Sequence, residues 1–410
     1  MNLEYFIAKR LVTAKSYKSS VSSPIIKIAI LAIALSILMM IVSVSTGIGL
    51  QQKIREKIAA FNGHIVISNY DDNQSQVTVD PIHMPKELFV KLEKHSGIAH
   101  VQEVATKAAL IRTEKEFEGI VFKGVGANYD WSKLEEFLIQ GQLPKFDNTV
   151  TNEVVISKYL ADRLHLKLKS SFNTFFMKEQ GKRPSVRKFT IVGIYNSGFQ
   201  EFDASYVIGD IQHIQRINKW QKNQVGAYEV FVNDFTKMDQ ITQEVYQQIP
   251  PTYNCVSIQE KYTSIFEWLK LFDFNIIVVL IIMIVVATIN MVVALLVLIL
   301  ERTQLIGLLK AMGATNWTIR KIFIYNALHL ISRGLLYGNG IALLILILQK
   351  QFGIVKLNPE SYYVAVAPVT INLVHIVLLN LGTILICGIV LLIPSYIITK
   401  VTPVRALRFE

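Results

Sequence analysis

The stretch "ERTQLIGLLKAMGATNWTIRKIF", residues 301–323, decides how this chain is organised. It is amphipathic and net basic, yet 25 uncharged, mostly apolar residues precede it and another long apolar run follows it. A helix of about 20 apolar residues is long enough to cross the hydrocarbon core of a membrane. The stretch therefore predicts a short charged helix that joins two membrane spans on the same side of the bilayer.

Four stretches of the 410-residue chain have the length and hydrophobicity of a membrane span. They cover residues 28–46, 276–300, 322–348 and 371–399. Residues 47–273, between the first and the second of these stretches, form a polar segment large enough for one or two globular domains. We expect a membrane protein with four transmembrane α-helices and a large α/β extracytoplasmic domain between helices 1 and 2.

The positive charge of the chain, +11 in total, is concentrated beside the spans. Residues 47–273 contain 27 basic and 27 acidic residues, whereas residues 1–27, 301–321 and 400–410 are each net basic. Basic residues in short segments beside spans mark the cytoplasmic side. Both termini and residues 301–321 are therefore expected in the cytoplasm, and residues 47–273 and 349–370 outside. The same distribution excludes a nucleic-acid-binding protein.

The first span has two interpretations. A basic start, an apolar run and the small residues 43–45 are also typical of a cleaved secretory signal. The run is long for a signal, however, and an apolar helical stripe of Leu50, Ile54 and Ile58 continues it. We favour an uncut membrane anchor, which N-terminal sequencing would distinguish from a signal.

The polar segment shows one pattern of elements twice. Strand-like and helical patterns alternate over residues 47–127 and again over residues 226–258, which predicts one α/β subdomain split by an insertion. The insertion, residues 128–225, has its own strand patterns and one short helix, residues 158–164. We expect it to form a separate, mostly β lobe.

The chain lacks the common catalytic and cofactor-binding motifs. No G-x-x-x-x-G-K-[ST], H-E-x-x-H or G-x-S-x-G occurs, and the eight histidines show no metal-ligand spacing. We therefore expect a non-catalytic membrane subunit that itself binds no cofactor and no metal.

Apolar residues within the opening stretch repeat at helical spacing. Gly313 suits the end of that helix, and Thr315 or Asn316 can cap the next one. One interpretation is an amphipathic connector that lies among the lipid headgroups. The other is a coupling helix, a rigid lever on which a cytoplasmic partner pushes. The residues that share the apolar face are Leu305, Leu308, Leu309 and Met312.

The same stretch resembles the signature of the FtsX-like permease superfamily of ABC transporters. In that family a charged pair, an Ile-Gly pair, a basic residue and a Gly-Ala turn precede span three. The four-span layout and the C-terminal "TPVRALRFE" also resemble this superfamily, which implies an outer domain of the MacB-like periplasmic core type. The resemblance assigns coupling to an ATPase to Glu301, Arg302, Ile306, Gly307, Lys310, Gly313 and Ala314.

Within that superfamily the chain is most similar to the lipoprotein-releasing permeases of the LolC and LolE type. The segments "GVGANYDWSKLEEFLIQGQL", "NEVVISKYLADRL" and "GKRPSVRKFTIVGIYNSGFQEFD" carry this resemblance. In such permeases a protruding hairpin contacts a periplasmic lipoprotein carrier, and the alternative here is a plain solvated β-hairpin. The matching residues of this chain are Gly181, Pro184, Arg187 and Phe189.

The resemblance implies a multi-pass protein of the bacterial inner membrane that extracts lipoproteins for a periplasmic carrier. ATP and Mg²⁺ would bind a separate cytoplasmic ABC ATPase, and a second permease copy or a paralogue would complete the complex. Two other functions stay open: an efflux permease of the MacB type, and an FtsX-like regulator of cell-wall hydrolases. An efflux permease usually carries its ATPase in the same chain, and the regulator generally has a smaller outer domain.

Apolar and methionine side chains on spans one and two are candidates for a lipid path, since methionine adapts to irregular apolar ligands. Ordinary helix packing is the alternative for each of them. The candidates are Met39, Met40, Val42, Ile284 and Met291.

Span three carries polar residues at helical spacing, namely Asn326, His329 and Arg333. An intramembrane charge normally faces protein or water, and Asn290 of span two lies at a similar depth. We expect this stripe to hold spans two and three together or to face a second subunit. The alternative is that the arginine snorkels toward an interface. Gly334 and Gly338 form a small-xxx-small pair, which favours close helix approach.

Overall fold

The computed structural model describes residues 4, 6–7, 10, 22–70, 80–114, 116–146, 149–178 and 183–396. The chain divides into two compact units. The membrane unit contains Met1–Gln51, Trp268–Lys356 and Val366–Glu410. The sheet unit contains Gln52–Glu267 and Leu357–Ala365.

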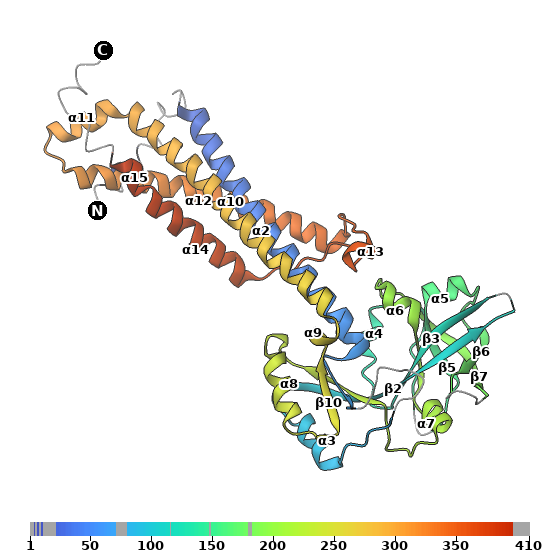
Figure 1. The fold of residues 1–410 in the computed structure, drawn as a ribbon. Helices are drawn as coiled ribbons and strands as arrows, with labels where there is room; N and C mark the ends of the chain where they lie inside the picture. The colour runs from blue at the N-terminus through green and yellow to red at the C-terminus, as the bar shows by residue number, and fades with distance from the viewer. Residues whose placement is uncertain are drawn as a thin grey trace. The chain divides into compact units, whose positions relative to one another are not determined.

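Four helices of the described part are long and apolar enough to cross a membrane, and they lie side by side in the membrane unit (Figure 1). They are α2 (Ser22–Asn62), α10 (Thr263–Glu301), α12 (Asn316–Phe352) and α14 (Leu373–Val390), the last continued by α15 (Leu392–Ser395). The first three extend beyond the predicted spans because the sequence beside each apolar run keeps a helical pattern. The fourth begins slightly later than predicted, and residues 397–399 lie outside the described part.

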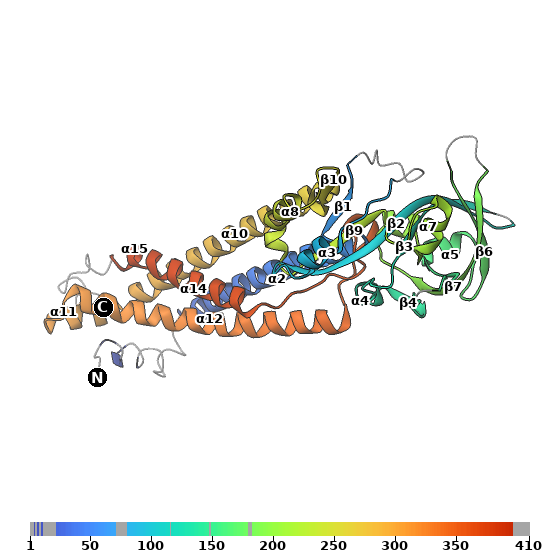
Figure 2. The ribbon, with the colours of Figure 1, turned by 90° about the horizontal axis from the view of Figure 1, so that it is seen from below.

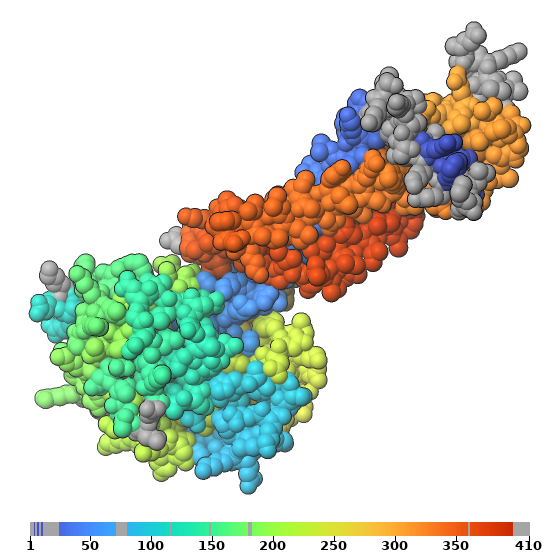
Figure 3. Space-filling model, turned by 180° about the vertical axis from the view of Figure 1, so that it is seen from behind, coloured from blue at the N-terminus to red at the C-terminus, as the bar shows by residue number. Residues whose placement is uncertain are grey.

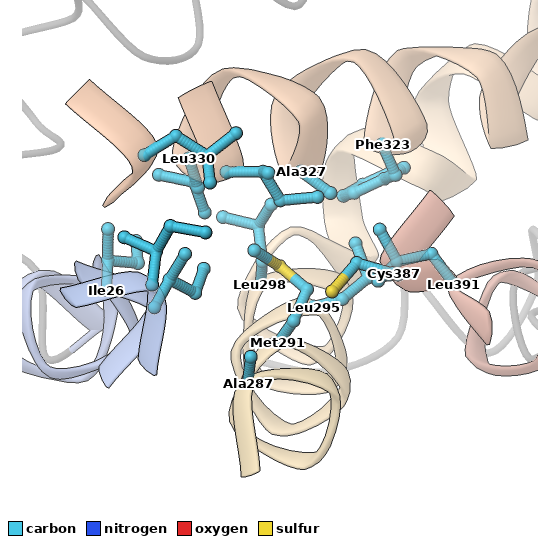
Figure 4. Packing of buried hydrophobic residues seen from close by; sticks show 14 of the residues in the cluster. Ile26, Ala287, Met291, Leu295, Leu298, Phe323, Ala327, Leu330, Cys387 and Leu391 are labelled. Carbon is cyan, nitrogen blue, oxygen red and sulfur yellow. The ribbon is translucent and has the colours of Figure 1, made fainter. Parts of the chain in front are cut away.

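The core of the membrane unit is a cluster of buried aliphatic side chains to which all four long helices contribute (Figure 4). Ala287, Met291 and Leu295 of α10 face Phe323 and its neighbours on α12. Much apolar surface remains on the outside, and α12 and α14 form one face of the unit (Figure 3). Such surface suits hydrocarbon chains or further apolar helices.

Helices α2 and α12 approach closely at two glycines. A Cβ at Gly334 would lie 2.6 Å from Ile33, and one at Gly338 would lie 1.8 Å from Ile37 and 2.7 Å from the carbonyl oxygen of Ala34. No side chain fits in either place, which confirms the predicted small-xxx-small contact.

The sheet unit is built on one sheet of ten strands, in the order β10-β1-β9-β2-β3-β8-β5-β7-β4, with β6 paired to β2 and β7. The strands are β1 (Ile65–Asn69), β2 (Ile98–Arg112), β3 (Phe117–Val125), β4 (Leu138–Gly141), β5 (Glu153–Ser157), β6 (Ser171–Phe176), β7 (Ser185–Tyr195), β8 (Tyr206–Asp210), β9 (Ala227–Val232) and β10 (Tyr253–Ser257). The helices are α3 (Lys86–Glu93), α4 (Ser132–Glu135), α5 (Lys158–Arg163), α6 (Gln200–Ser205), α7 (Gln212–Asn218), α8 (Met238–Tyr246) and α9 (Ile258–Lys261), with a 3₁₀ turn η2 (Phe235–Lys237).

The predicted separate lobe is not separate. Strand β8 of the insertion pairs in parallel with β3, and β6 pairs with β2, so the strands of residues 128–225 continue the sheet of residues 47–127 and 226–258. The described part of the insertion also contains four helices, which makes it mixed α/β. The prediction failed because an open strand edge takes a hydrogen-bonded neighbour from any distance along the chain, and local periodicity does not reveal which.

A second difference concerns the segment between α12 and α14, which contains the short helix α13 (Pro359–Tyr362). Residues 357–365 of this segment belong to the sheet unit, although the sequence predicts only a loop between spans.

Candidate functional site

The predicted coupling segment forms helix α11 (Thr303–Ala311) between α10 and α12. The helix ends in two capping bonds: Gly313 N–H donates to the carbonyl of Lys310 at 3.0 Å, and Ala314 N–H donates to that of Leu309 at 2.9 Å. This is a Schellman motif, which needs the left-handed backbone of Gly313, φ 89°. Thr315 then caps α12, because its hydroxyl accepts from Thr318 N–H at 3.2 Å. The turn is therefore sharp and well defined.

The outward face of α11 is partly apolar. Leu308 is 50% exposed and Met312 is 68% exposed, whereas Ile306 and Gly307 are buried in the membrane unit. The predicted apolar stripe is thus divided: Leu308 and Met312 face outward, whereas Leu305 is half-buried and Leu309 packs against the core of the membrane unit. Of the other residues predicted for the ATPase contact, Glu301 and Gly313 are exposed, and Arg302, Lys310 and Ala314 are half-buried.

The polar stripe of span three is split between two environments. Asn326 is 1% exposed, and neither amide atom has a hydrogen-bond partner in the described part of the chain, while His329 and Arg333 are exposed. Asn290 donates to the carbonyl of Val286 in its own helix at 2.8 Å. Within the described residues no hydrogen bond joins Asn290 to Asn326, His329 or Arg333, so a role of the stripe at a second subunit stays a prediction.

A polar link that sequence reasoning missed joins α12 to α14. The amides of Asn339 and Asn380 each donate to the other, at 2.7 and 2.9 Å. An asparagine within each apolar run was the available signal, but nothing in the sequence pairs the two.

The candidate lipid-path residues differ in how deeply they are buried. Met40 and Met291 are fully buried in the helix core, so their observed role is packing. Val42 and Ile284 pack against that core from its edge, and Met39 is 41% exposed. Met39 continues an exposed stripe on α2 that also contains Ile28, Leu31 and Leu35.

The predicted carrier-contacting hairpin is formed by the antiparallel strands β6 and β7 (Figure 2). Pro184 is exposed at its end, and Arg187, opposite Thr174, is half-buried. Phe189 is buried and stacks on Phe122 with ring centroids 5.0 Å apart, so it belongs to the core. Gly181 lies outside the described residues.

The end of α2 is held at the centre of the sheet by a buried ion pair. Lys123 Nζ donates to the last-turn carbonyl of Phe61 at 2.6 Å and lies 2.5 Å from Glu229 Oε1. Gln102 donates to the other oxygen of Glu229 at 2.8 Å. A cation at a helix C-terminus satisfies an orphan carbonyl and complements the helix dipole. A cavity of about 610 Å³ opens beside this network, lined also by Asn62.

The turn after α2 makes the stability of the sheet unit dependent on pH. His64 Nδ1 accepts from Val232 N–H at 3.0 Å, and burial, aided by nearby Lys133, lowers the pKa of His64 from 6.5 to about 4. Between these values the unfolded chain binds a proton that the folded chain does not. The free energy of unfolding should therefore fall by about 3 kcal/mol from pH 6.5 to 4 and be insensitive to this group above pH 6.5.

His64→Asn checks this expectation, because asparagine offers an acceptor but does not titrate. Denaturant unfolding of the full chain at pH 7.5 and 4.5 should give a smaller loss for the variant than for the wild type. Equal losses would contradict the assignment to His64.

Two family models match the chain. The MacB-like periplasmic core domain covers residues 28–248, and the FtsX-like permease C-terminal domain covers residues 277–403. The chain is 22% identical to the lipoprotein-releasing system transmembrane protein LolC of Neisseria meningitidis serogroup B, over 100% of both chains. It is also 22% identical to the LolC of Haemophilus influenzae, over 100% of this chain and 99% of that one.

Two solved structures are similar to part of the chain. The extracellular domain of the ABC-type transporter YknZ from Gram-positive bacteria is 16% identical, covers 47% of this chain and 99% of its own, and has a TM-score of 0.32. The periplasmic region of MacB from Actinobacillus actinomycetemcomitans is 14% identical, covers 49% and 91%, and has a TM-score of 0.33.

Proposed function

The chain belongs to the family of FtsX-like permeases that carry a MacB-like periplasmic core domain, and from this membership we propose that it extracts lipoproteins from a bacterial inner membrane. It would be the membrane subunit of an ABC transporter that passes its cargo to a periplasmic carrier. Similarity over the whole chain to transmembrane proteins of lipoprotein-releasing systems supports this cargo.

The observation that carries the mechanism is the continuity of α2, which runs unbroken from the membrane unit to Asn62 in the sheet unit. Helix α10 likewise begins in the sheet unit and ends at α11. A displacement of α11 would therefore move α10 and α12 directly. The ion pair of Lys123 would pass a movement of α2 to the sheet.

A motor is required by the energetics of the cargo. Each acyl methylene group withdrawn from a membrane costs about 0.8 kcal/mol, so three exposed acyl chains would cost on the order of tens of kcal/mol. ATP and Mg²⁺ would act on a separate ATPase subunit that docks on the exposed face of α11. A second permease copy or a paralogue would cover part of the remaining apolar surface and the exposed charge of Arg333 on α12. Both termini would lie in the cytoplasm and the sheet unit in the periplasm.

Depletion of the protein tests this function. Lipoproteins destined for the outer membrane should accumulate in the inner membrane, because the ATP-driven extraction would be lost. The measurement is membrane fractionation followed by quantification of a triacylated lipoprotein in each fraction. The control is an integral outer-membrane protein, whose distribution should not change at early times.

Normal lipoprotein sorting with altered drug sensitivity would instead indicate an efflux permease.

A second measurement tests whether ATP is hydrolysed by a separate chain. The purified protein alone should hydrolyse no ATP, and it should co-purify with an ATPase; ATP hydrolysis by this chain unaided would contradict the proposal.

A further inference from the structure

The segment between α12 and α14 forms a closed loop with a paired stem. Leu357 N–H donates to the carbonyl of Ala365 at 3.0 Å, and Ala367 N–H donates to that of Val355 at 3.0 Å. The amide of Gln349, in the last turn of α12, bonds to Val355 and Ala367 as well. We name residues 357–365 the strap. Its stem is fixed to α12, while the strap itself packs within the sheet unit.

An aromatic stack joins the strap to the end of α2. The ring of Tyr363 stacks on Phe199 with centroids 4.7 Å apart, and Phe199 stacks on Phe202 at 4.5 Å. Phe202 in turn stacks on Phe61, in the last turn of α2, at 4.9 Å. The three phenylalanines are almost completely buried, and Tyr363 has a left-handed backbone, φ 57°. A left-handed backbone is unfavourable for a non-glycine residue, and it persists only where the surrounding contacts hold it.

Lys57 of α2 bonds to the strap beside this aromatic stack. Its ammonium group donates to the carbonyl of Ser197 and, at 3.0 Å, to the carbonyl of Tyr363. The Ser197 loop is itself held by Asp203, which accepts from Ser197 Oγ at 2.8 Å and from Gly198 N–H at 3.0 Å. Lys57 is 6% exposed, and a lysine is rarely this buried unless its ammonium group is paired with other polar groups.

We propose that the strap couples α12 and α14 to the sheet unit, with Lys57 and Tyr363 as the residues that position it. The inference rests on the proposed function, since it states how part of the ATP-driven movement would reach the sheet. A push on α11 enters α12, whose far end continues through the paired stem into the strap. The strap and α2 end on the same aromatic stack. A movement that arrives through α12 and the strap and one that arrives through α2 would therefore act on the same part of the sheet unit. An unfastened strap would let α12 move without moving the sheet.

The groups that face the Lys57 amine are Asp203, Lys53 and Glu136. Burial, reinforced by Lys53, lowers the pKa of Lys57 to about 8. Replacement of Lys57 by methionine leaves the carbonyls of Ser197 and Tyr363 without this donor, but it also removes a desolvated charge, which offsets part of that cost. We therefore expect the variant to fold with a modest loss of stability.

The test uses the permease complex with its ATPase in proteoliposomes that contain a triacylated lipoprotein. Tyr363→Ala and Lys57→Met should reduce the lipoprotein released per ATP hydrolysed by about tenfold. ATP hydrolysis should be unchanged, and the midpoint of thermal unfolding should fall by only a few degrees, because each variant loses only a ring stack or a few hydrogen bonds. Tyr363→Phe should keep most of the release per ATP, because the stacked ring and the backbone carbonyl that Lys57 contacts both remain. Tyr70→Ala, at a tyrosine that is largely exposed, is the matched control.

A second measurement reports the docking itself. In the full chain, Lys57 should react with an amine-acylating reagent far more slowly than the exposed Lys158, because burial blocks access even though the lower pKa of Lys57 gives it more of the reactive neutral amine. Tyr363→Ala should increase the rate at Lys57. Normal release per ATP in Tyr363→Ala, or a fast reaction of Lys57 in the wild type, would overturn the inference. A parallel fall of release, ATP hydrolysis and stability would also overturn it, since that indicates a structural role alone. A wild-type complex that hydrolyses ATP but releases no lipoprotein, with Lys57 still protected, would instead reject the proposed function.

Discussion

Gly338→Leu is expected to separate α2 from α12 and to abolish any activity that needs the assembled helix bundle. Even the first carbon of a side chain would lie 1.8 Å from Ile37 and 2.7 Å from the backbone oxygen of Ala34. The side chain of Ile37 can rotate, but the backbone oxygen belongs to a rigid helix and cannot yield. Overpacking of this kind costs about 3 kcal/mol at the upper end of its usual range. Titration of the full chain with denaturing detergent, followed by helix content, measures the loss.

The matched control is Gly340→Leu on the same helix, two residues away. Nothing lies within 4 Å of a Cβ at Gly340, so this variant should unfold at the wild-type detergent concentration. Ile37→Ala combined with Gly338→Ala should recover only part of the loss, because the clash with the oxygen of Ala34 remains. If Gly338→Leu and Gly340→Leu unfold alike, the close approach of α2 and α12 is not a stabilising contact.

The glycine contact was predictable because it depends on local information. Two small residues four positions apart in an apolar run indicate a close helix approach, whichever helix is the partner. The four spans and the turn at Gly313 follow from equally local signals, namely hydropathy, a glycine at a helix end and a capping threonine. The sequence did not identify Ile37 as the neighbour, since that depends on how the helices assemble.

The remainder of the candidate site depends on contacts between distant segments. Lys123 and Glu229 lie 106 positions apart, and Lys57 and Tyr363 lie 306 apart. A buried lysine has the same letter in the sequence as a solvated one, so counting charges could not distinguish Lys57 and Lys123 from lysines at the surface. The strap was missed for a related reason: a loop between spans gives no local sign that its aromatic ring completes a stack elsewhere. The strand pairing of β3 with β8 is a third contact of this type.

The burial of Lys123 leads to the second large prediction. Lys123→Met should lower the free energy of unfolding of the sheet unit by about 3–5 kcal/mol. The variant leaves the carboxylate of Glu229 buried, with Gln102 as its remaining hydrogen-bond donor among the described side chains, and it removes the donor to the carbonyl of Phe61. Denaturant unfolding of the full chain, followed by the near-ultraviolet signal of the aromatic side chains, provides the measurement.

Two comparisons separate the cost of an orphaned charge from the value of the link itself. Glu136→Gln removes the partner of Lys53 in a pair whose side chains are 33% and 45% exposed, and it should cost less than about 1 kcal/mol. Lys123→Met combined with Glu229→Met removes both buried charges, so much of the lost stability should return. The double variant still lacks the donor to Phe61, however, and if that bond transmits movement from α2 to the sheet, lipoprotein release per ATP should stay low. Full release by a stable double variant would mean that the ion pair serves the fold alone, and that α2 moves the sheet through its apolar and aromatic contacts.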